Sequence, residues 1–242
     1  PTPWSAPRAP RPPLWLEHIG RGGCNALWSQ CVENSVQHHY DICFVANDDC
    51  MFPRAGWLEG IIQIFEKNTH VGAVGIGADG AWDEQNRVRQ RYFTDPSLLV
   101  EAANDCERFK STPVKYAHHV SGVLWATRPQ LWIDAGGIPK ELFWAFGEAV
   151  PCIEMRKSGY QSVACQYPCT IVHYGGGAER EIHSDFTRHE SFVKRSRELG
   201  DDGAYFAQRY GTGHLHLLAQ EFDDKLPSMN LAPLVYDPPE MP

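Results

Sequence analysis

The stretch YDICFVANDDCMFPRAGWLEGIIQIF, residues 40–65, constrains the fold of this chain more than any other part of the sequence. An apolar segment, residues 42–46, leads directly into Asn47, Asp48 and Asp49. A buried strand with acidic residues at its C-terminal end is where open α/β sheets bind ligands. Two adjacent carboxylates suit a hard divalent cation, and such a cation suits phosphate. The stretch therefore predicts a nucleotide-phosphate site, although Asn and Asp also commonly turn a chain before a helix.

The overall charge limits the classes of partner. The chain has 242 residues and a formal net charge of −8. A protein that binds nucleic acid needs a basic face to neutralise phosphates, so we expect no nucleic-acid partner. A nucleotide ligand remains compatible with this charge, because a bound metal ion can supply positive charge locally.

The eight cysteines form no C-x-x-C pair. Cys43 stands inside the apolar segment, where it takes the place of a small hydrophobic residue. We interpret the cysteines as reduced thiols and predict a cytoplasmic protein, although an even count also fits the disulfides of a secreted one. No apolar run reaches the roughly 18 residues that span a bilayer, so no transmembrane segment is expected.

The composition divides the chain into three parts. Residues 1–13 are rich in proline and are expected to form an extended arm. Residues 14–178 alternate strand-like and helical segments, which favours a doubly wound α/β sheet. Residues 179–242 begin with an amphipathic, charged segment and end in a proline-containing tail, so we expect a C-terminal helical extension.

Periodicity and breakers place the elements of the main part. Helices are expected at residues 25–37, from the proline of the opening stretch to Phe65, and at 97–109, 129–135 and 148–158. Strands are expected at residues 71–76, 114–126, 162–167 and 170–173. The adjacent histidines His118 and His119 are expected to point apart, which would make them poor joint metal ligands.

Three segments, taken together, resemble the family-2 glycosyltransferases of GT-A fold. They are Asn47-Asp48-Asp49, residues 118–160, and Thr170-Ile171-Val172-His173 with the glycines that follow. Members of that family move a sugar from a nucleotide-diphosphate donor to an acceptor hydroxyl. The resemblance covers about residues 14–178 and implies an α/β fold with a GT-A (Rossmann-like) mixed sheet flanked by helices.

The resemblance also implies roles for single residues. Asp49 corresponds to the acid of the metal motif that touches the cation, and His173 to a histidine near the metal and diphosphate. Phe146-Gly147-Glu148 resembles the segment that carries the catalytic base, which would be Glu148. Ser121-Gly122, followed by Arg128 and Gly136-Gly137, resembles a stretch that borders the acceptor site. The residues expected to bind the donor are Gly22, Gly23, Asn47, Asp48, Ser121 and Gly122.

The chemistry that the resemblance implies is an inverting transfer in one displacement. A carboxylate such as that of Glu148 can accept the proton of the acceptor hydroxyl as the new bond forms. Mn²⁺ or Mg²⁺ would neutralise charge on the departing diphosphate. An imidazole together with a carboxylate favours Mn²⁺, because Mg²⁺ prefers oxygen ligands. A glycan, a lipid or a protein could supply the acceptor in such glycan biosynthesis.

Each assignment has a structural alternative. Glu148 is also the kind of acid that the dipole favours at a helix N-terminus, and His173 could be a strand-end histidine bonded to backbone. Asp48 would replace Asp49 as metal ligand if the register shifts by one residue. Trp144 could form a platform for an acceptor sugar, but an aromatic residue among others is more often part of a core.

The chain departs from the family pattern in two places. Family members begin with strands that hold the nucleotide base, and here the chain starts near the third strand, so we expect an N-terminally truncated sheet with an exposed edge. A missing N-terminal segment or a partner chain could complete it. Glu148-Ala149 also replaces the usual pair of acids. The alternative function is therefore a non-catalytic glycosyltransferase-like module that binds a glycan or a partner chain.

Overall fold

The computed structural model describes residues 23–47, 50–51, 57–77, 114–165, 172–173 and 199–236. The helices are α1 (Gly23–Gln37), α2 (Trp57–Lys67), α5 (Pro129–Asp134), α6 (Ala149–Lys157) and α9 (Leu215–Lys225), followed by the short 3-10 helix η2 (Leu226–Ser228). The strands are β1 (Cys43–Ala46), β2 (Cys50–Met51), β3 (Val71–Gly77), β4 (Lys115–Ala117), β5 (Val120–Thr127), β6 (Gln161–Ala164) and β7 (Val172–His173). Residues 199–210 are also helical and are called the 199–210 helix below.

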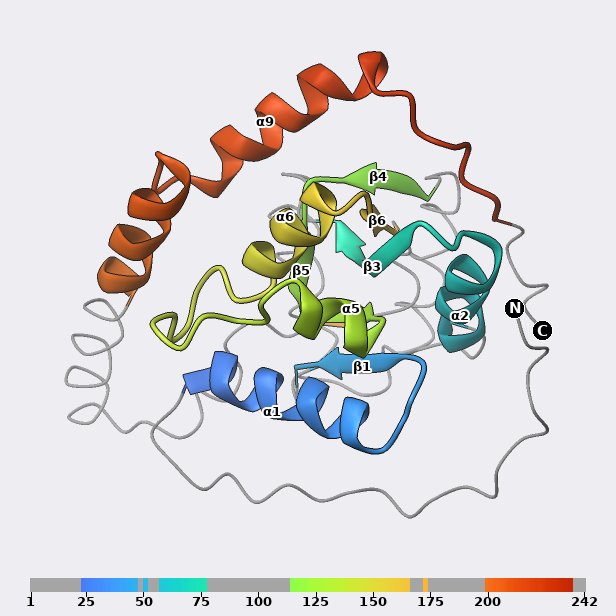
Figure 1. Cartoon of the computed structure of the whole chain (residues 1–242), viewed down its shortest axis with the longest axis horizontal. Helices are drawn as coiled ribbons and strands as arrows, with labels where there is room; N and C mark the ends of the chain where they lie inside the picture. Colours follow the sequence, from blue (N-terminus) through green and yellow to red (C-terminus); the bar gives the residue numbers. More distant parts are fainter. Residues whose placement is uncertain are drawn as a thin grey trace.

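The central element is a five-stranded sheet in the order β1-β5-β3-β6-β4 (Figure 1). Strands β3 and β6 run parallel, whereas the other three pairings are antiparallel. Strands β2 and β7 form a separate two-stranded ladder. The expected mixed sheet flanked by helices is therefore confirmed, and parallel pairing within the described residues is confined to β3 and β6.

Two hydrophobic clusters cover the two faces of the sheet. On one face, Trp28 of α1 and Trp132 of α5 pack against Trp125 of β5, and Phe206 of the 199–210 helix belongs to the same cluster. On the other face, the buried side chains of α2 pack against Leu124 of β5. Alternate residues of one strand thus contribute to both clusters, as strand geometry requires. Strand β5 is the shared centre of the structure.

The helices of the C-terminal part form an arc along the outside of the sheet (Figure 1, orange to red). The sequence predicts only a packed tail for the last 30 residues, and that prediction misses α9. Leu215, Leu218 and Phe222 recur at helical spacing, and Phe222 is buried against the domain. None of the helices in the described ranges is both long and apolar enough to span a bilayer.

The segment expected to be one strand, residues 114–126, is two. Strand β4 pairs with β6 and β5 pairs with β1 and β3, and the chain bends between them at His118 and His119. The two histidines do not point apart, because their Nδ1 atoms lie 3.2 Å from each other. Burial, Arg156 and His119 together lower the pKa of His118 to about 3, so His118 is neutral at physiological pH.

Helix α2 presents one apolar face to the sheet. Ile61, Ile64 and Phe65 are buried, whereas Leu58 is exposed.

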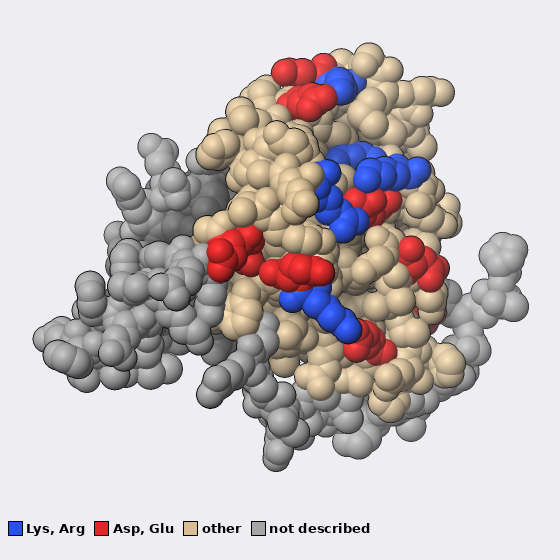
Figure 2. Space-filling view, turned by 60° about the vertical axis from the view of Figure 1, so that its left-hand side comes forward, with Lys and Arg blue, Asp and Glu red and all other residues tan. Residues whose placement is uncertain are grey.

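On the described surface, acidic and basic side chains are interspersed over the face shown in Figure 2. Burial raises the pKa of the thiols of Cys43 and Cys152 to about 11, so both are poor nucleophiles at neutral pH.

Arg128 joins the end of β5 to α2 and β3. Its guanidinium donates hydrogen bonds to the carbonyl oxygens of Phe65 (2.7 Å) and Val71 (3.2 Å), and it lies over the Phe65 ring at 5.3 Å. A cation at the last carbonyls of a helix is favoured by the helix dipole. The side chain therefore fixes the C-terminus of α2, at the far end of β5 from Gly122.

We expect Arg128→Met to lower the free energy of unfolding by about 1.5–3 kcal/mol, because it removes charged hydrogen bonds to partly buried carbonyl groups. Urea unfolding followed by tryptophan fluorescence measures this loss. The control is Lys140→Met, since Lys140 is an exposed cation. Equal stability losses in the two variants would show that Arg128 acts only through its charge.

Candidate active site

The segment that contains the predicted metal motif lies against Val123 of β5. The backbone N–H of Asn47 donates to the carbonyl oxygen of Val123 at 2.9 Å. The Sγ atom of Cys50 donates to the same oxygen at 3.7 Å. Asp48 and Asp49 stand between these two residues in the sequence and lie outside the described residues. The chain on both sides of the acidic pair is thus fixed at one point of β5.

The predicted histidine ligand belongs to the strand that pairs with this segment. Cys50 of β2 is directly opposite His173 of β7 in the antiparallel ladder. Cys50 directly follows Asp49 in the sequence, so the register brings the residue after the predicted carboxylate ligand opposite the backbone of the predicted histidine ligand. The His173 side chain lies outside the described residues. Within the described residues, no group of three potential ligands gathers, and the roles of Asp49 and His173 stay predictions.

Glu148, which precedes α6, lies against Gly122 of β5, the residue next to Val123. Its Oε1 atom is 3.3 Å from the position that a Cβ on Gly122 would occupy, so the glycine leaves the space that the carboxyl group uses. Glu148 is the N-cap residue of α6, yet its side chain makes no capping hydrogen bond to the helix. Glu148 thus stands where the helix dipole favours an acid, while its carboxyl group contacts Gly122 of β5, and its role as base stays a prediction.

The surroundings of Glu148 favour its neutral form. Burial raises the pKa of the carboxyl group, and hydrogen bonds from the backbone amides of Glu148 and Gly122 act in the opposite direction without cancelling the rise. Trp28 of α1 reaches the same place on β5, because its ring is 2.7 Å from the Cβ position on Gly122. The ring in turn packs edge-on against Trp125, with centroids 6.0 Å apart. A carboxyl group in such a site holds its proton to a higher pH than an exposed one.

Asn25 is not among the predicted site residues, yet it supports the loop before Glu148. The side chain is 1% exposed, and its Nδ2 atom donates to the carbonyl oxygen of Ala145 at 3.2 Å. Its Oδ1 atom lies 2.0 Å from where a Cβ on Gly147 would be, so only glycine fits at position 147. A buried Asn at the start of a helix is a signal for such a backbone contact.

Asp202, a 1% exposed residue of the 199–210 helix, was not predicted as a site residue either. Its carboxylate accepts hydrogen bonds from the backbone amides of Phe143, Trp144 and Ala145. No local pattern could reveal this contact, because the partners are more than 50 positions apart in the sequence. The loop that leads to Glu148 is therefore bound both by α1, through Asn25, and by the 199–210 helix, through Asp202.

The remaining predicted binding residues have structural contacts of their own. Gly23 has a φ of +62°, and a Cβ there would lie 2.3 Å from the carbonyl oxygen of Phe143. The hydroxyl of Ser121 accepts a hydrogen bond from the Val123 amide at 3.4 Å. Gly22 lies outside the described residues. The donor-binding roles of all three stay predictions.

Comparisons with known proteins give one distant likeness. No protein-family model matches the sequence. No curated protein matches it either. A solved structure with some likeness is a mannosyltransferase from Pyrobaculum calidifontis in complex with GDP-Man and Mn²⁺. The two chains are 16% identical with a TM-score of 0.45, and the match covers 85% of this chain and 50% of that one. The chain thus spans half the length of that protein, and a likeness at this level does not establish a shared fold.

The raised pKa of Glu148 predicts a pH-dependent change in stability. The folded protein keeps the Glu148 proton to a higher pH than the unfolded chain does. The stabilisation by the neutral carboxyl is thus fully present below the unfolded pKa and is lost as the pH rises through the folded pKa. Glu148→Gln stays neutral, so we expect it to exceed the wild type in stability at about pH 8 by about 1.4 kcal/mol for each unit of the rise, and to match it at about pH 4.

Thermal unfolding at the two pH values measures this difference. The exposed Glu141 provides the matched control, and Glu141→Gln should leave the difference between the two pH values close to that of the wild type. A Glu148→Gln variant that loses stability at the higher pH would show that the carboxylate is favourably paired in the folded protein.

Proposed function

We propose that this chain is a metal-dependent glycosyltransferase, or the catalytic part of one, that transfers a sugar from a nucleotide-diphosphate donor to an acceptor hydroxyl with inversion. The observation that carries the proposal is the convergence on β5 of three segments that resemble the family motifs. Glu148 lies on Gly122, and the adjacent Val123 binds Asn47 and Cys50, which flank the acidic pair. Pairing of Cys50 with His173 adds the third segment.

Glu148 is the proposed general base. Burial raises the pKa of Glu148 towards the operating pH. A general base is most effective when its pKa lies near that pH. The Gly122 amide donates a hydrogen bond to the carboxyl group, and the Trp28 ring lies beside the same position of β5. Glu148 would take the proton of the acceptor hydroxyl while that oxygen attacks the anomeric carbon and the diphosphate leaves.

The residues present fit a divalent cation at the neighbouring position. Asp49 and His173 would hold it, because Cys50, which directly follows Asp49 in the sequence, pairs with His173 and because carboxylate and imidazole are ligands of Mn²⁺. When bound, the cation neutralises charge on the diphosphate leaving group. Asn47 and Asp48 would bind the donor from the same segment, and Ser121 and Gly122 from β5.

A transfer assay tests this function. With a panel of UDP-, GDP- and dTDP-sugars and Mn²⁺ or Mg²⁺, we expect the wild type to release nucleoside diphosphate in the presence of a glycan acceptor. Glu148→Gln should lower kcat by about 100-fold or more while the KM for the donor changes little, because only proton transfer is lost. Glu141→Gln, which changes an exposed acid, should keep wild-type turnover. Full activity of Glu148→Gln would remove Glu148 as the base.

Metal binding tests the other half of the site. We expect Asp49→Asn and His173→Ala each to weaken Mn²⁺ binding by about tenfold or more in calorimetry with UDP or GDP present. Asp41→Asn is the matched control, since Asp41 is an exposed acid in the same stretch of sequence. A folded wild-type chain that binds a glycan but neither Mn²⁺ nor nucleotide would instead support the non-catalytic module.

A further inference from the structure

The loop of residues 143–148 is irregular, and its backbone amides are bound by one buried carboxylate. Asp202 Oδ1 accepts the amide of Phe143 at 2.8 Å, and Oδ2 accepts the amides of Trp144 and Ala145 at 2.7 Å each. These distances are at the short end for N–H···O hydrogen bonds, as expected for a charged acceptor. The 199–210 helix thus binds three successive residues of the loop.

A carboxylate is an expensive group to bury unless it gains strong hydrogen bonds. An aliphatic side chain would fill the same space without that cost, but it would leave three loop amides without these partners. The contact therefore specifies one backbone conformation of residues 143–145. Its position matters because Glu148 follows only three residues later.

The backbone between this contact and Glu148 is strained and is held by the same helix. Phe146 has a φ of +61°, a conformation that costs a non-glycine residue free energy. Its ring stacks on the fully buried Phe206 with centroids 4.3 Å apart and an interplanar angle of 16°. Phe206 is four residues after Asp202, so both side chains leave the same face of the helix. One helix face thus supports the loop at residues 143–146.

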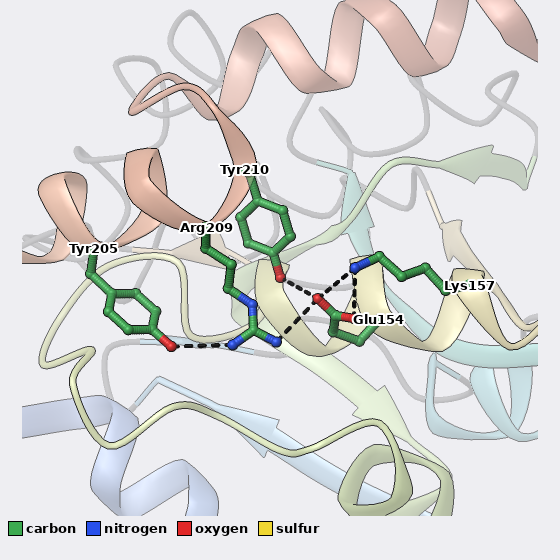
Figure 3. Close-up of polar contacts among 5 residues, drawn as sticks. All are labelled: Glu154, Lys157, Tyr205, Arg209 and Tyr210. Atoms are coloured by element: carbon green, nitrogen blue, oxygen red, sulfur yellow. Dashed lines mark hydrogen bonds and ion pairs between the residues drawn. The ribbon is translucent and has the colours of Figure 1, made fainter.

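The far end of the same helix is fixed to α6. Glu154 of α6 accepts hydrogen bonds from the Tyr210 hydroxyl at 2.7 Å and from Arg209 Nη2 at 3.2 Å (Figure 3). Although partial burial acts to raise it, hydrogen bonds from Lys157, Tyr210 and Arg209 hold the pKa of Glu154 below its usual range. Helix α6 begins directly after Glu148. The 199–210 helix therefore contacts the chain both before the proposed base, at residues 143–146, and after it, at Glu154.

We propose that Asp202 is a positioning residue: by binding the amides of Phe143, Trp144 and Ala145, it holds Glu148 against Gly122 in the geometry needed for proton transfer. This inference rests on the proposed role of Glu148. It makes the C-terminal helix part of the active site, although Asp202 does not touch the reacting atoms. A displacement of the base by about 1 Å can reduce a rate by about 100-fold.

The test compares Asp202→Asn with Asp201→Asn, which removes an exposed charge from the same helix turn. Amide hydrogen exchange of residues 143–145 should be slow in the wild type and about tenfold or more faster in Asp202→Asn, because an amide group cannot accept all three hydrogen bonds. Carbon-13 NMR of the Glu148 carboxyl should show its pKa moving down towards the ordinary range, since the released side chain gains solvent. Asp201→Asn should change neither quantity.

The kinetic readout uses the same variants. Asp202→Asn should lower kcat by about tenfold or more, with little change in the KM for the donor, and should move the acidic limb of the kcat profile to lower pH. The loss should disappear when the change is made in Glu148→Gln, because the two residues act through one group. Should Asp202→Asn not fold, Asp202→Glu keeps the charge and displaces the carboxylate, with smaller changes in the same directions.

The outcomes separate this inference from the proposed function. Fast exchange of residues 143–145 in the wild type, or unchanged exchange in a folded Asp202→Asn or Asp202→Glu, overturns the inference. Faster exchange with an unchanged Glu148 titration also overturns it, because Asp202 would then hold the loop without positioning the carboxyl group. If exchange and titration change as expected while the wild type transfers no sugar from any donor, the positioning of Glu148 by Asp202 stands and the proposed function fails.

Discussion

The parts of the candidate site can meet because residue 122 is glycine, which has no side chain. A Cβ on Gly122 would lie 2.7 Å from the Trp28 ring and 3.3 Å from Glu148 Oε1, so α1 and the loop before α6 can reach the same strand only because position 122 is glycine. The next residue, Val123, offers its carbonyl oxygen to Asn47 and Cys50. Two successive positions of β5 therefore set the distance between the proposed base and the acidic segment.

Two features of the proposed site lower the stability of the fold, and contacts from distant elements offset this loss. The surroundings of Glu148 disfavour its charged form and Phe146 has a left-handed backbone, and both reduce stability. Their support comes from Asn25 of α1 and from Asp202 and Phe206 of the 199–210 helix. Because these contacts join segments far apart in the sequence, the loop can adopt its conformation only when the whole domain is assembled.

The local elements could be predicted from sequence because their signals are local. Helical periodicity gave α1 and α6, and Gly136-Gly137 after α5 have φ values of +97° and +63°, as a helix C-terminus favours. The division of residues 114–126 into β4 and β5 was missed because the run of residues carries no strong breaker, and the choice of partner strands decides the bend at His118. The family motifs named Glu148 and Gly122 as separate site residues without predicting their contact, whereas Asp202 carries no local signal and contributes only through tertiary contacts.

The two halves of the candidate site are held by different interactions. The loop before Glu148 is fixed by side chains that bind its backbone amides and carbonyl groups. In the described residues, the other half depends on the contacts of Asn47 and Cys50 with Val123 and on the two-residue pairing of β2 with β7. So short a ladder contributes few hydrogen bonds of its own. A cation bound by Asp49 and His173 would add a link across this ladder, so on the proposed function the binding of metal and donor would complete this half of the site, whereas the loop of the proposed base is held by the protein's own contacts.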